Sequence, residues 1–285
     1  MRKKLMICFT LLFFCAAARA WQADDAYEFA ESLYEDADYY RAIGEYKRYI
    51  FISENGHKTP KALFKIGMSY LNAERWDEAM SSFENIEMRF SGKTAERAML
   101  ARSLSLQKKR DFNFSKSINE AFLDSRSRDG IGMNFYYLNA WNYIYEKEWN
   151  AARIIFEEID GGVFGESSAQ IAERLKISGN IPQKSPVLGG ILAAVLPGSG
   201  HLYSGKLWEG FTSMLMSGYF IYRTYEAFSA NNNLDKVLFG APAVVFYGSN
   251  IYGSINAAHR FNAAQTDGYI RHLEGLKVDV LTFDY

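Results

Sequence analysis

"LFKIGMSYLNAERWDEAMSSFENI", residues 63–86, has a spacing of small and aromatic residues that predicts two packed helices. Gly67 is followed three residues later by Tyr70 and twelve residues later by Ala79, and Phe83 continues at helical spacing. A small residue in each helix lets the two axes approach closely, and aromatic side chains three or four positions further on fill the groove between them. The stretch therefore predicts a helix–turn–helix unit.

The same frame recurs on both sides of this stretch. Because one helix pair cannot bury its own apolar face, copies are expected to stack on one another. The matching positions are Ala30, Leu33, Ala42, Tyr46 and Tyr49 upstream, and Ala140, Tyr143, Ala152, Phe156 and Ile159 downstream.

The third copy of the frame is degenerate. Small first-helix residues are expected at Ala30, Gly67, Ala101 and Ala140, which predicts a unit of about 34 residues with loop insertions. In the third copy, Asn113 stands where the second small residue belongs. The predicted fold class is all-α, a helical-repeat solenoid over residues 21–180.

This pattern resembles the tetratricopeptide repeat family over about half of the chain, and the units with "YYRAIGEY" and "RWDEAMSSF" look most like the repeats of exported bacterial envelope proteins. The family's positions are occupied in the second unit by Leu63, Gly67, Tyr70, Ala79 and Phe83. The resemblance implies a binding scaffold whose concave face, lined by the first helix of each pair, takes a peptide or a partner helix.

Six residues are the candidates for that concave face. Tyr70 can alternatively be interpreted as a core residue. The polar candidates can alternatively be interpreted as ordinary solvated side chains. The candidates are Tyr34, Lys65, Tyr70, Asn72, Arg102 and Asn139.

Residues 1–20 have the features of an export signal: a basic start, the apolar core "LMICFTLLFF" and the small-residue end "AARA". The alternative is an uncleaved membrane anchor. Both cysteines, Cys8 and Cys15, lie inside this segment, so the predicted mature chain has no disulfide, no cysteine nucleophile and no cysteine metal site.

The second half of the chain is apolar. After a linker at residues 181–186, residues 187–260 predict a membrane domain with a short or re-entrant helix at 187–203 and two spanning helices joined by the polar turn "SANNNLD". Full crossing by 187–203 is the alternative, and it would move the C-terminal tail, residues 261–285, to the other side. The tail ends in "KVDVLTFDY", whose alternation is typical of a short strand.

The stretch "PGSGHLYSGKLWEGF", residues 197–211, is one hydroxyl short of a nucleotide-binding loop. Such a loop needs Ser or Thr after its Gly-Lys to ligate magnesium, and Leu207 stands there. A turn at the membrane surface explains the proline, the glycines and the amphipathic aromatic residues better. Its residues are Pro197, Gly198, Gly200, Tyr203, Gly205 and Trp208.

This turn resembles a small bacterial membrane domain that carries Pro-Gly-x-Gly-x-x-Tyr-x-Gly ahead of a spanning pair. Two stripes of small residues at four-residue spacing predict close helix–helix contacts within the chain or in a homo-oligomer. Asn250 and Asn256 are expected to face protein rather than lipid. The stripes are Gly190, Ala194 and Gly198, and Ser249, Gly253 and Ala257.

Composition and motifs favour binding over chemistry. The net charge of −1 provides no general attraction for nucleic acid. None of the four histidines has a second ligand at helical spacing for zinc, and no nucleophile constellation is present. We therefore expect that the chain is not an enzyme and that it has no cofactor, no metal and no catalytic residue. His201 with Glu209 is expected to be an ordinary surface pair.

Together these features predict a membrane-anchored scaffold for protein–protein interaction in a bacterial cell envelope. The repeats would face the periplasm after signal cleavage, and the helical hairpin would hold them at the inner membrane, where tethering raises the effective concentration of a partner. The alternative is an oligomeric membrane transport or pore assembly with the repeats as a docking cap.

Overall fold

The computed structural model describes residues 21–53, 56–126 and 130–281. The predicted signal peptide and both cysteines lie outside these residues. The described part is helical and contains no strand, and its helices follow one another in a repeat-like order. The chain divides into two compact units, one with the residues up to 175 and those from 277 on, and one with residues 176–276.

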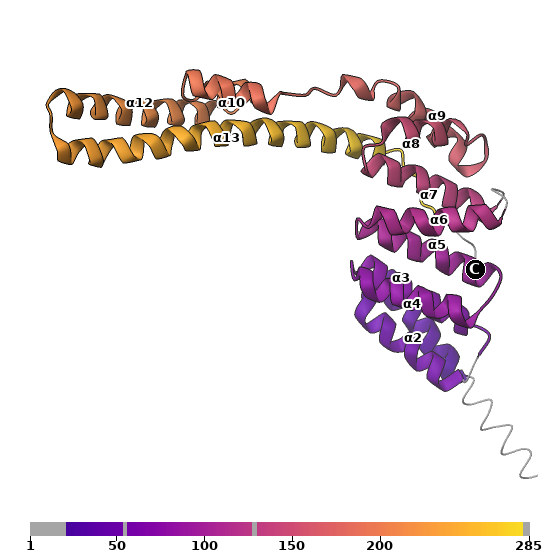
Figure 1. The fold of residues 1–285 in the computed structure, drawn as a ribbon. Coiled ribbons are helices and arrows are strands. Elements are labelled where there is room, and N and C mark those ends of the chain that lie inside the picture. Colours follow the sequence, from indigo (N-terminus) through magenta and orange to yellow (C-terminus); the bar gives the residue numbers. More distant parts are fainter. Residues whose placement is uncertain (1–20, 54–55, 127–129, 282–285) are drawn as a thin grey trace, which may run out of the picture. The chain divides into compact units, whose positions relative to one another are not determined.

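Unit 1 is a series of helix pairs, which confirms the predicted all-α repeat architecture (Figure 1). Each helix packs against the next one in the chain. Residues 21–35 form the first described helix, and the others are α2 (Tyr39–Ser53), α3 (Thr59–Asn72), α4 (Trp76–Arg89), α5 (Lys93–Lys108), α6 (Phe112–Ser125), α7 (Ile131–Tyr145), α8 (Trp149–Glu157) and α9 (Gly162–Leu175).

The turn between the two helices has the same geometry in all four pairs. Ala37, Glu74, Arg110 and Lys147 have positive φ values of 59°, 58°, 69° and 67°. In each turn this residue donates its N–H three positions back, and the next residue donates five positions back. These two hydrogen bonds satisfy the last carbonyl groups of the first helix. The left-handed conformation is nevertheless unfavourable for every residue other than glycine.

These turns correct the expected register of the third pair. In the other pairs the small first-helix residue lies nine positions before the second helix, and the same rule gives Ser103 rather than Ala101. The second small residue is then Ser115 rather than Asn113, and the two serine Oγ atoms lie 2.9 Å apart. The repeat spacing is 37, 36 and 37 residues, so the expected unit of about 34 residues was too short.

The interior of the second pair shows why a small residue is needed. A Cβ atom added to Gly67 would lie 2.5 Å from Cε1 of Phe83, which is fully buried. The residues equivalent to Phe83 in the other pairs, Tyr46, Asn119 and Phe156, are also buried. Three of these four side chains are aromatic, and they fill the space between paired helices.

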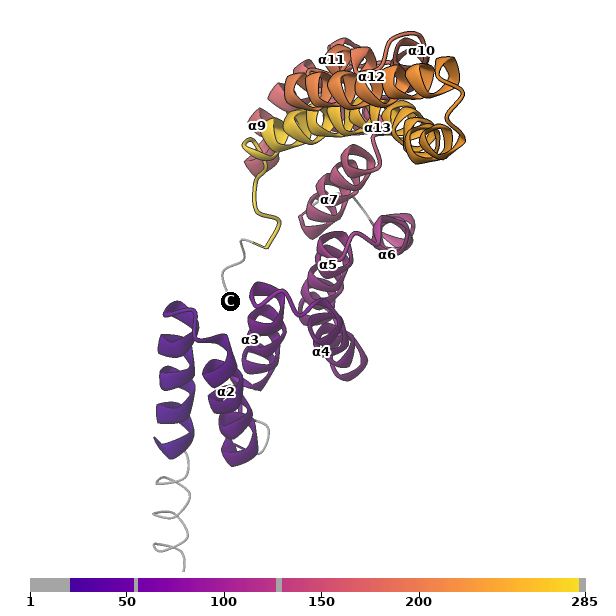
Figure 2. The same ribbon diagram turned by 90° about the vertical axis from the view of Figure 1, so that its left-hand side faces the viewer.

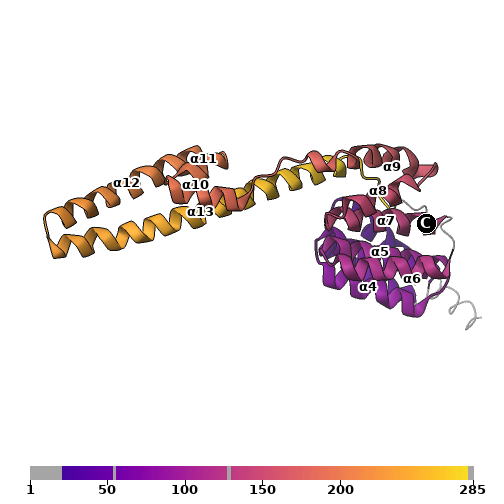
Figure 3. The same ribbon diagram turned by 45° about the horizontal axis from the view of Figure 1, so that its top comes forward.

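Unit 2 is built on a helical hairpin (Figure 3). The 310-helix η1 (Ser178–Asn180) and the helices α10 (Pro186–Val195) and α11 (Ser199–Tyr203) precede α12 (Leu207–Ser229), which runs antiparallel to α13 (Asn233–Glu274). Asn232 caps α13 by accepting hydrogen bonds from the N–H groups of Leu234 and Asp235, so the polar turn is confirmed.

No helix in the described part of the chain combines the length and the apolarity that a membrane crossing requires. The hairpin is confirmed, and its membrane-spanning character stays a prediction.

Asn250 on α13 joins the parts of unit 2. Its Oδ1 accepts from the N–H of Gly198 (2.8 Å) and from Oγ of Ser213 on α12 (2.7 Å), and its Nδ2 donates to the carbonyl of Ala193 on α10 (3.0 Å). The side chain is 3% exposed. The prediction that Asn250 faces protein is confirmed, whereas Asn256 is only half-buried.

The predicted stripes of small residues are confirmed in part. Gly190 and Ala257 are buried, and a Cβ added to Gly190 would lie 2.9 Å from the side chain of Ile255. Ala194 is exposed because α10 turns Ala193 toward α13 instead, and Ser249 is exposed on α13.

The segments on either side of residues 187–260 are more ordered than the sequence suggested. The predicted tail from residue 261 remains part of α13 as far as Glu274, and residues 277–281 form no strand. In the predicted linker, Lys184 is held by Asn262, which accepts from the Lys184 N–H at 2.7 Å and donates to its carbonyl at 2.9 Å.

Candidate functional site

The helix that opens each pair contributes to one face of unit 1. We call the surface formed by residues 21–35, α3, α5 and α7 the first-helix face. In Figure 2, α3, α5 and α7 lie on the side approached by the yellow segment after α13, and α4 and α6 lie on the other side. This is the face on which the sequence placed the candidate partner site.

Residues 277–280 lie on the first-helix face and belong to no helix or strand. Nζ of Lys277 donates to Oε1 of Gln107 on α5 at 2.8 Å and lies 4.8 Å from the ring centroid of Trp141 on α7. The same ammonium lies 5.2 Å from the ring of Tyr145 and 3.3 Å from its hydroxyl. An ammonium between two aromatic faces and an amide oxygen is a cation–π cage.

The backbone of the segment is also bound. The N–H of Val278 donates to the hydroxyl of Tyr137 at 3.0 Å, and Nδ2 of Asn134 donates to the carbonyl of Val280 at 2.7 Å. The side chain of Val280 is 1% exposed. The first-helix face therefore binds one cationic side chain, two backbone groups and one small apolar side chain.

A buried hydrogen-bond network orients the cage. Nε2 of Gln107 donates to the carbonyl of Leu138 at 3.1 Å and to Oδ1 of Asn142 at 2.7 Å. Nδ2 of Asn142 in turn donates to Oγ of Ser115 at 2.8 Å. Because both amide hydrogens of Gln107 are used, its Oε1 points out as an acceptor, which a donor such as an ammonium satisfies.

This network explains the degenerate third pair. Ser103, Ser115 and Asn119 stand where the second pair has Gly67, Ala79 and Phe83. Oγ of Ser103 donates to Oδ1 of Asn119 at 2.6 Å, and all three polar residues are fully buried. Polar residues replace apolar packing here because they belong to the network that ends at Gln107.

Three of the six candidate residues lie together on the first-helix face. Nδ2 of Asn72 donates to the hydroxyl of Tyr34 at 2.9 Å, and Nζ of Lys65 lies 4.1 Å from the centroid of the Tyr34 ring. Lys65 also pairs with Glu31 at 3.3 Å, and Glu31 accepts from the Tyr46 hydroxyl at 2.6 Å.

The charges of this cluster shift two pKa values. Burial alone would raise the pKa of Glu31, but the hydrogen bond from Tyr46 and the ammonium of Lys65 together hold it below its usual value. Burial raises the pKa of Tyr34, and the carboxylates of Glu31 and Asp279 add to this effect. Asp279 thus brings the bound segment within electrostatic reach of the predicted cluster.

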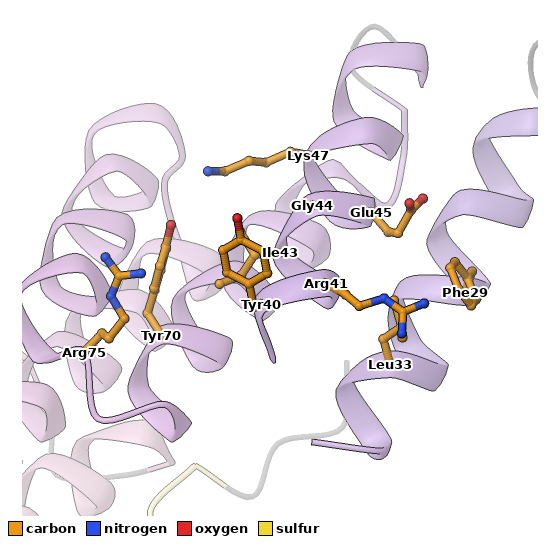
Figure 4. Close-up of a pocket in the computed structure, with 10 residues that line it drawn as sticks. All are labelled: Phe29, Leu33, Tyr40, Arg41, Ile43, Gly44, Glu45, Lys47, Tyr70 and Arg75. Atoms are coloured by element: carbon orange, nitrogen blue, oxygen red, sulfur yellow. The ribbon is translucent and has the colours of Figure 1, made fainter. Parts of the chain in front are cut away.

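Tyr70 and Arg102 line hollows on the opposite side of unit 1. We call this side, to which the second helix of each pair (α2, α4, α6 and α8) contributes, the second-helix side. Tyr70 lines a hollow of about 410 Å³ over α2, and the guanidinium of Arg75 lies 5.2 Å from its ring centroid (Figure 4). Arg102 lines a hollow of about 480 Å³ between α4 and α6, and its guanidinium forms a two-pronged pair with Glu87 at 2.7 and 2.8 Å. Neither side chain contributes to the first-helix face.

Asn139 is not available to a partner. It is 5% exposed, and its Oδ1 has no hydrogen-bond partner among the described residues. The prediction that Asn139 contributes to a partner-binding face is therefore wrong, because its side chain is buried inside unit 1.

Sequence reasoning missed the residues that hold the segment. Applying the observed spacing of 37, 36 and 37 residues to Tyr34 leads to Gln107, and applying it to Asn72 leads to Tyr145. The repeat therefore places these two residues at positions equivalent to two predicted candidates, but it carries no signal for the segment that binds there.

The residues of the predicted membrane turn form a tight crossing of backbones in unit 2. Pro197 follows the end of α10, and Gly198 has a φ of 89°, with the carbonyl of Gly210 only 2.2 Å from where its Cβ would stand. A Cβ on Gly200 would lie 2.1 Å from the carbonyl of Gly189.

The remaining turn residues differ in exposure. Gly205 has a φ of 79°, as the turn into α12 requires. The hydroxyl of Tyr203 accepts from the N–H of Ser185 at 3.0 Å, and its ring lies 5.3 Å from the ammonium of Lys184. Trp208 is 80% exposed.

The expected surface pairing of His201 with Glu209 was wrong in one respect, because His201 is 8% exposed. Its imidazole packs against Gly253, where a Cβ would lie 3.0 Å from Cε1. Among the described residues, no group of three or more histidine, cysteine, aspartate or glutamate side chains is arranged to hold a metal ion.

Comparison of the chain with protein-family models, with curated proteins and with solved structures found no match.

Proposed function

We propose that this protein is a membrane-anchored helical-repeat scaffold of the tetratricopeptide type, which recruits a protein or peptide partner in a bacterial cell envelope. The partner binds on the first-helix face of unit 1. Residues 187–260 anchor the chain at the inner membrane, and the repeats face the periplasm once the signal segment over residues 1–20 is removed. Anchoring raises the local concentration of the partner at the membrane.

The observation that carries the binding role is the segment of residues 277–280 on α5 and α7. A stacked helical array that already holds a chain segment through backbone and side-chain contacts has the chemistry of a peptide-binding surface. The repeat-like order of helix pairs supports the same role, because arrays of this kind provide continuous surfaces for partners.

The membrane role is supported by the surface of unit 2. Most of the exposed large apolar side chains of the described residues lie between residues 187 and 252. Exposed apolar patches of this extent mark lipid or protein contacts. On α12 they recur every three or four residues and are each more than half exposed: Trp208, Phe211, Leu215, Tyr219, Tyr222, Tyr225 and Phe228.

The binding role is tested by photocrosslinking in intact cells. A photoreactive residue replaces Asn72, which is exposed on the first-helix face, and a matched control replaces Phe114, which is 65% exposed on the second-helix side. A single partner protein joined at Asn72 through one extended stretch, and not joined at Phe114, is the expected result. Equal adducts at both positions, or self-adducts alone, would contradict the scaffold role.

The membrane role is tested by flotation of the full chain with vesicles of phosphatidylethanolamine and phosphatidylglycerol. The wild-type chain is expected to float, and a chain carrying Phe211→Ser, Leu215→Ser and Tyr222→Ser is expected to lose most of its binding. Met88→Ser with Phe114→Ser removes exposed apolar surface from unit 1 and should leave flotation unchanged. Release of a dye trapped in the vesicles would favour the pore assembly instead.

A further inference from the structure

Residues 277–280 occupy the first-helix face although they belong to no helix or strand. They follow the end of α13 and belong to unit 1 by their contacts. The helix pairs of unit 1 pack on one another through their own buried residues, whereas the contacts of this segment include the Lys277 cage, the buried Val280 side chain and two backbone hydrogen bonds. The segment thus has the contacts of a bound peptide.

We propose that the surface of α5 and α7 is a lysine-reading peptide site, and that residues 277–280 of the same chain occupy it until a partner segment of the same chemistry displaces them. This inference rests on the proposed scaffold function and names both the chemistry of the partner and the intramolecular competitor.

The first requirement on the partner is a lysine side chain. Oε1 of Gln107 is fixed as an acceptor because both hydrogens of its amide are bound by Leu138 and Asn142. The rings of Trp141 and Tyr145 present their faces to the ammonium at 4.8 and 5.2 Å. A neutral side chain of the same length would leave the buried Gln107 oxygen without a donor.

The second requirement concerns the three residues after the lysine. The next residue must offer an N–H to Tyr137, which excludes proline at that position. The residue three positions after the lysine must offer its carbonyl to Asn134 and a small apolar side chain to the buried site that Val280 occupies. The partner motif is therefore lysine, a residue other than proline, any residue, and a small apolar residue.

Occupation by the chain itself makes the site competitive. A segment on the same chain acts at an effective concentration on the order of millimolar. A free peptide with the same contacts is then outcompeted, and a natural partner must add contacts beyond the four residues. The cluster of Tyr34, Lys65 and Asn72 lies on the same face, within electrostatic reach of Asp279, and is where such contacts are available.

The test measures binding of a fluorescent peptide with the sequence of residues 275–281 to the full chain by anisotropy. Binding to the wild-type chain is expected to be weak, and binding to a Lys277→Ala chain at least tenfold tighter, because its own segment no longer holds the cage. Lys236→Ala, a substitution of a half-buried lysine in unit 2, is the control and should behave like wild type.

Peptide variants on the Lys277→Ala chain test the chemistry without altering the fold. Replacing the peptide's lysine by norleucine removes the ammonium and keeps the length, and methylating the following backbone nitrogen removes the donor to Tyr137. Each change is expected to weaken binding of the peptide by tenfold or more. A scrambled peptide is expected to bind at least tenfold more weakly as well. Equal binding of the norleucine peptide would overturn the lysine-reading role.

Hydrogen exchange of residues 276–281 in the full chain gives a second measure. The Lys277→Ala substitution is expected to raise the exchange rate of residues 276–281. Adding saturating peptide to this variant is expected to protect α5 and α7 but not residues 276–281. No peptide binding to either chain, with residues 276–281 still protected in Lys277→Ala, would identify a permanent strap and overturn the inference. Dimers of the wild-type chain that require Lys277 would also overturn it, since a second copy would then supply the segment.

Different results would overturn the proposed scaffold function and the proposed lysine-reading site. The crosslinking experiment at Asn72 does not depend on Lys277, so capture of a partner without any peptide binding would overturn this inference alone. Peptide binding in the Lys277→Ala chain without a captured partner would overturn the partner role in cells and leave the site itself intact.

Discussion

At the scale of single residues, the turns of unit 1 carry a cost that can be removed. Ala37 has a φ of 59° and an exposed side chain, so its Cβ atom gains no packing and is disfavoured in the left-handed conformation. Ala37→Gly is expected to raise the free energy of unfolding by about 1 kcal/mol, and Ala37→Val to lower it. Urea denaturation of the three chains measures this, and a loss of stability in Ala37→Gly would contradict the turn geometry.

Glu31 makes the stability of the first pair depend on pH. Its pKa is lower in the folded chain than in the unfolded chain, so its contribution is complete above the unfolded value and is lost as pH falls through the folded value. Glu31→Gln is therefore expected to be less stable than wild type at pH 7, with the difference shrinking toward pH 3. Urea denaturation across this range is the measurement. A difference independent of pH would mean that the carboxylate contributes nothing through its charge.

At the scale of helices, two glycines of unit 1 should respond in opposite ways to alanine. A Cβ on Gly67 would meet Phe83 at 2.5 Å, so Gly67→Ala is expected to lower the free energy of unfolding by about 1–3 kcal/mol. Gly44 lies inside α2 with nothing within 4 Å of its would-be Cβ, so Gly44→Ala is expected to raise it by about 0.5–1 kcal/mol. Similar effects from both would argue against the packing of α3 on α4.

At the scale of the whole molecule, the two units should unfold separately. Asn250→Ala leaves three polar groups of unit 2 without a partner, at a cost on the order of 3 kcal/mol, and should raise hydrogen exchange in α12 and α13. Gly67→Ala should raise exchange in α3 and α4 alone. The effects are expected to add in the double variant, because the two sites share no contact.

The control for the unit 2 variant is Asn256→Ala, since Asn256 is half-buried on the same helix and has no side-chain hydrogen bond among the described residues. Its effect should be much smaller. Exchange that rises in both units after either substitution would show a single cooperative body instead of two.

The sequence by itself determined the helix pairs and their order, because small and aromatic residues at helical spacing have one favourable arrangement, in which the small residue of one helix admits the ring of the other. The sequence assigned Gly67 and Phe83 to the same helix pair as its small and aromatic residues, and the structure showed that they contact each other. The same reasoning found the polar turn before α13 and the inward-facing Asn250, since local capping and the cost of burying an amide depend on few neighbours.

Only the tertiary structure decided where the candidate site lies. Gln107 becomes an acceptor for a lysine because Asn142 and Leu138 take its hydrogens, and that orientation depends on the packing of α5 against α7. The bound Lys277 is 170 residues away from Gln107 along the chain, and no periodicity in the sequence relates the two. A pattern with a fixed period can specify helices and their stacking, whereas a contact between a repeat and a segment outside it is set by folding alone.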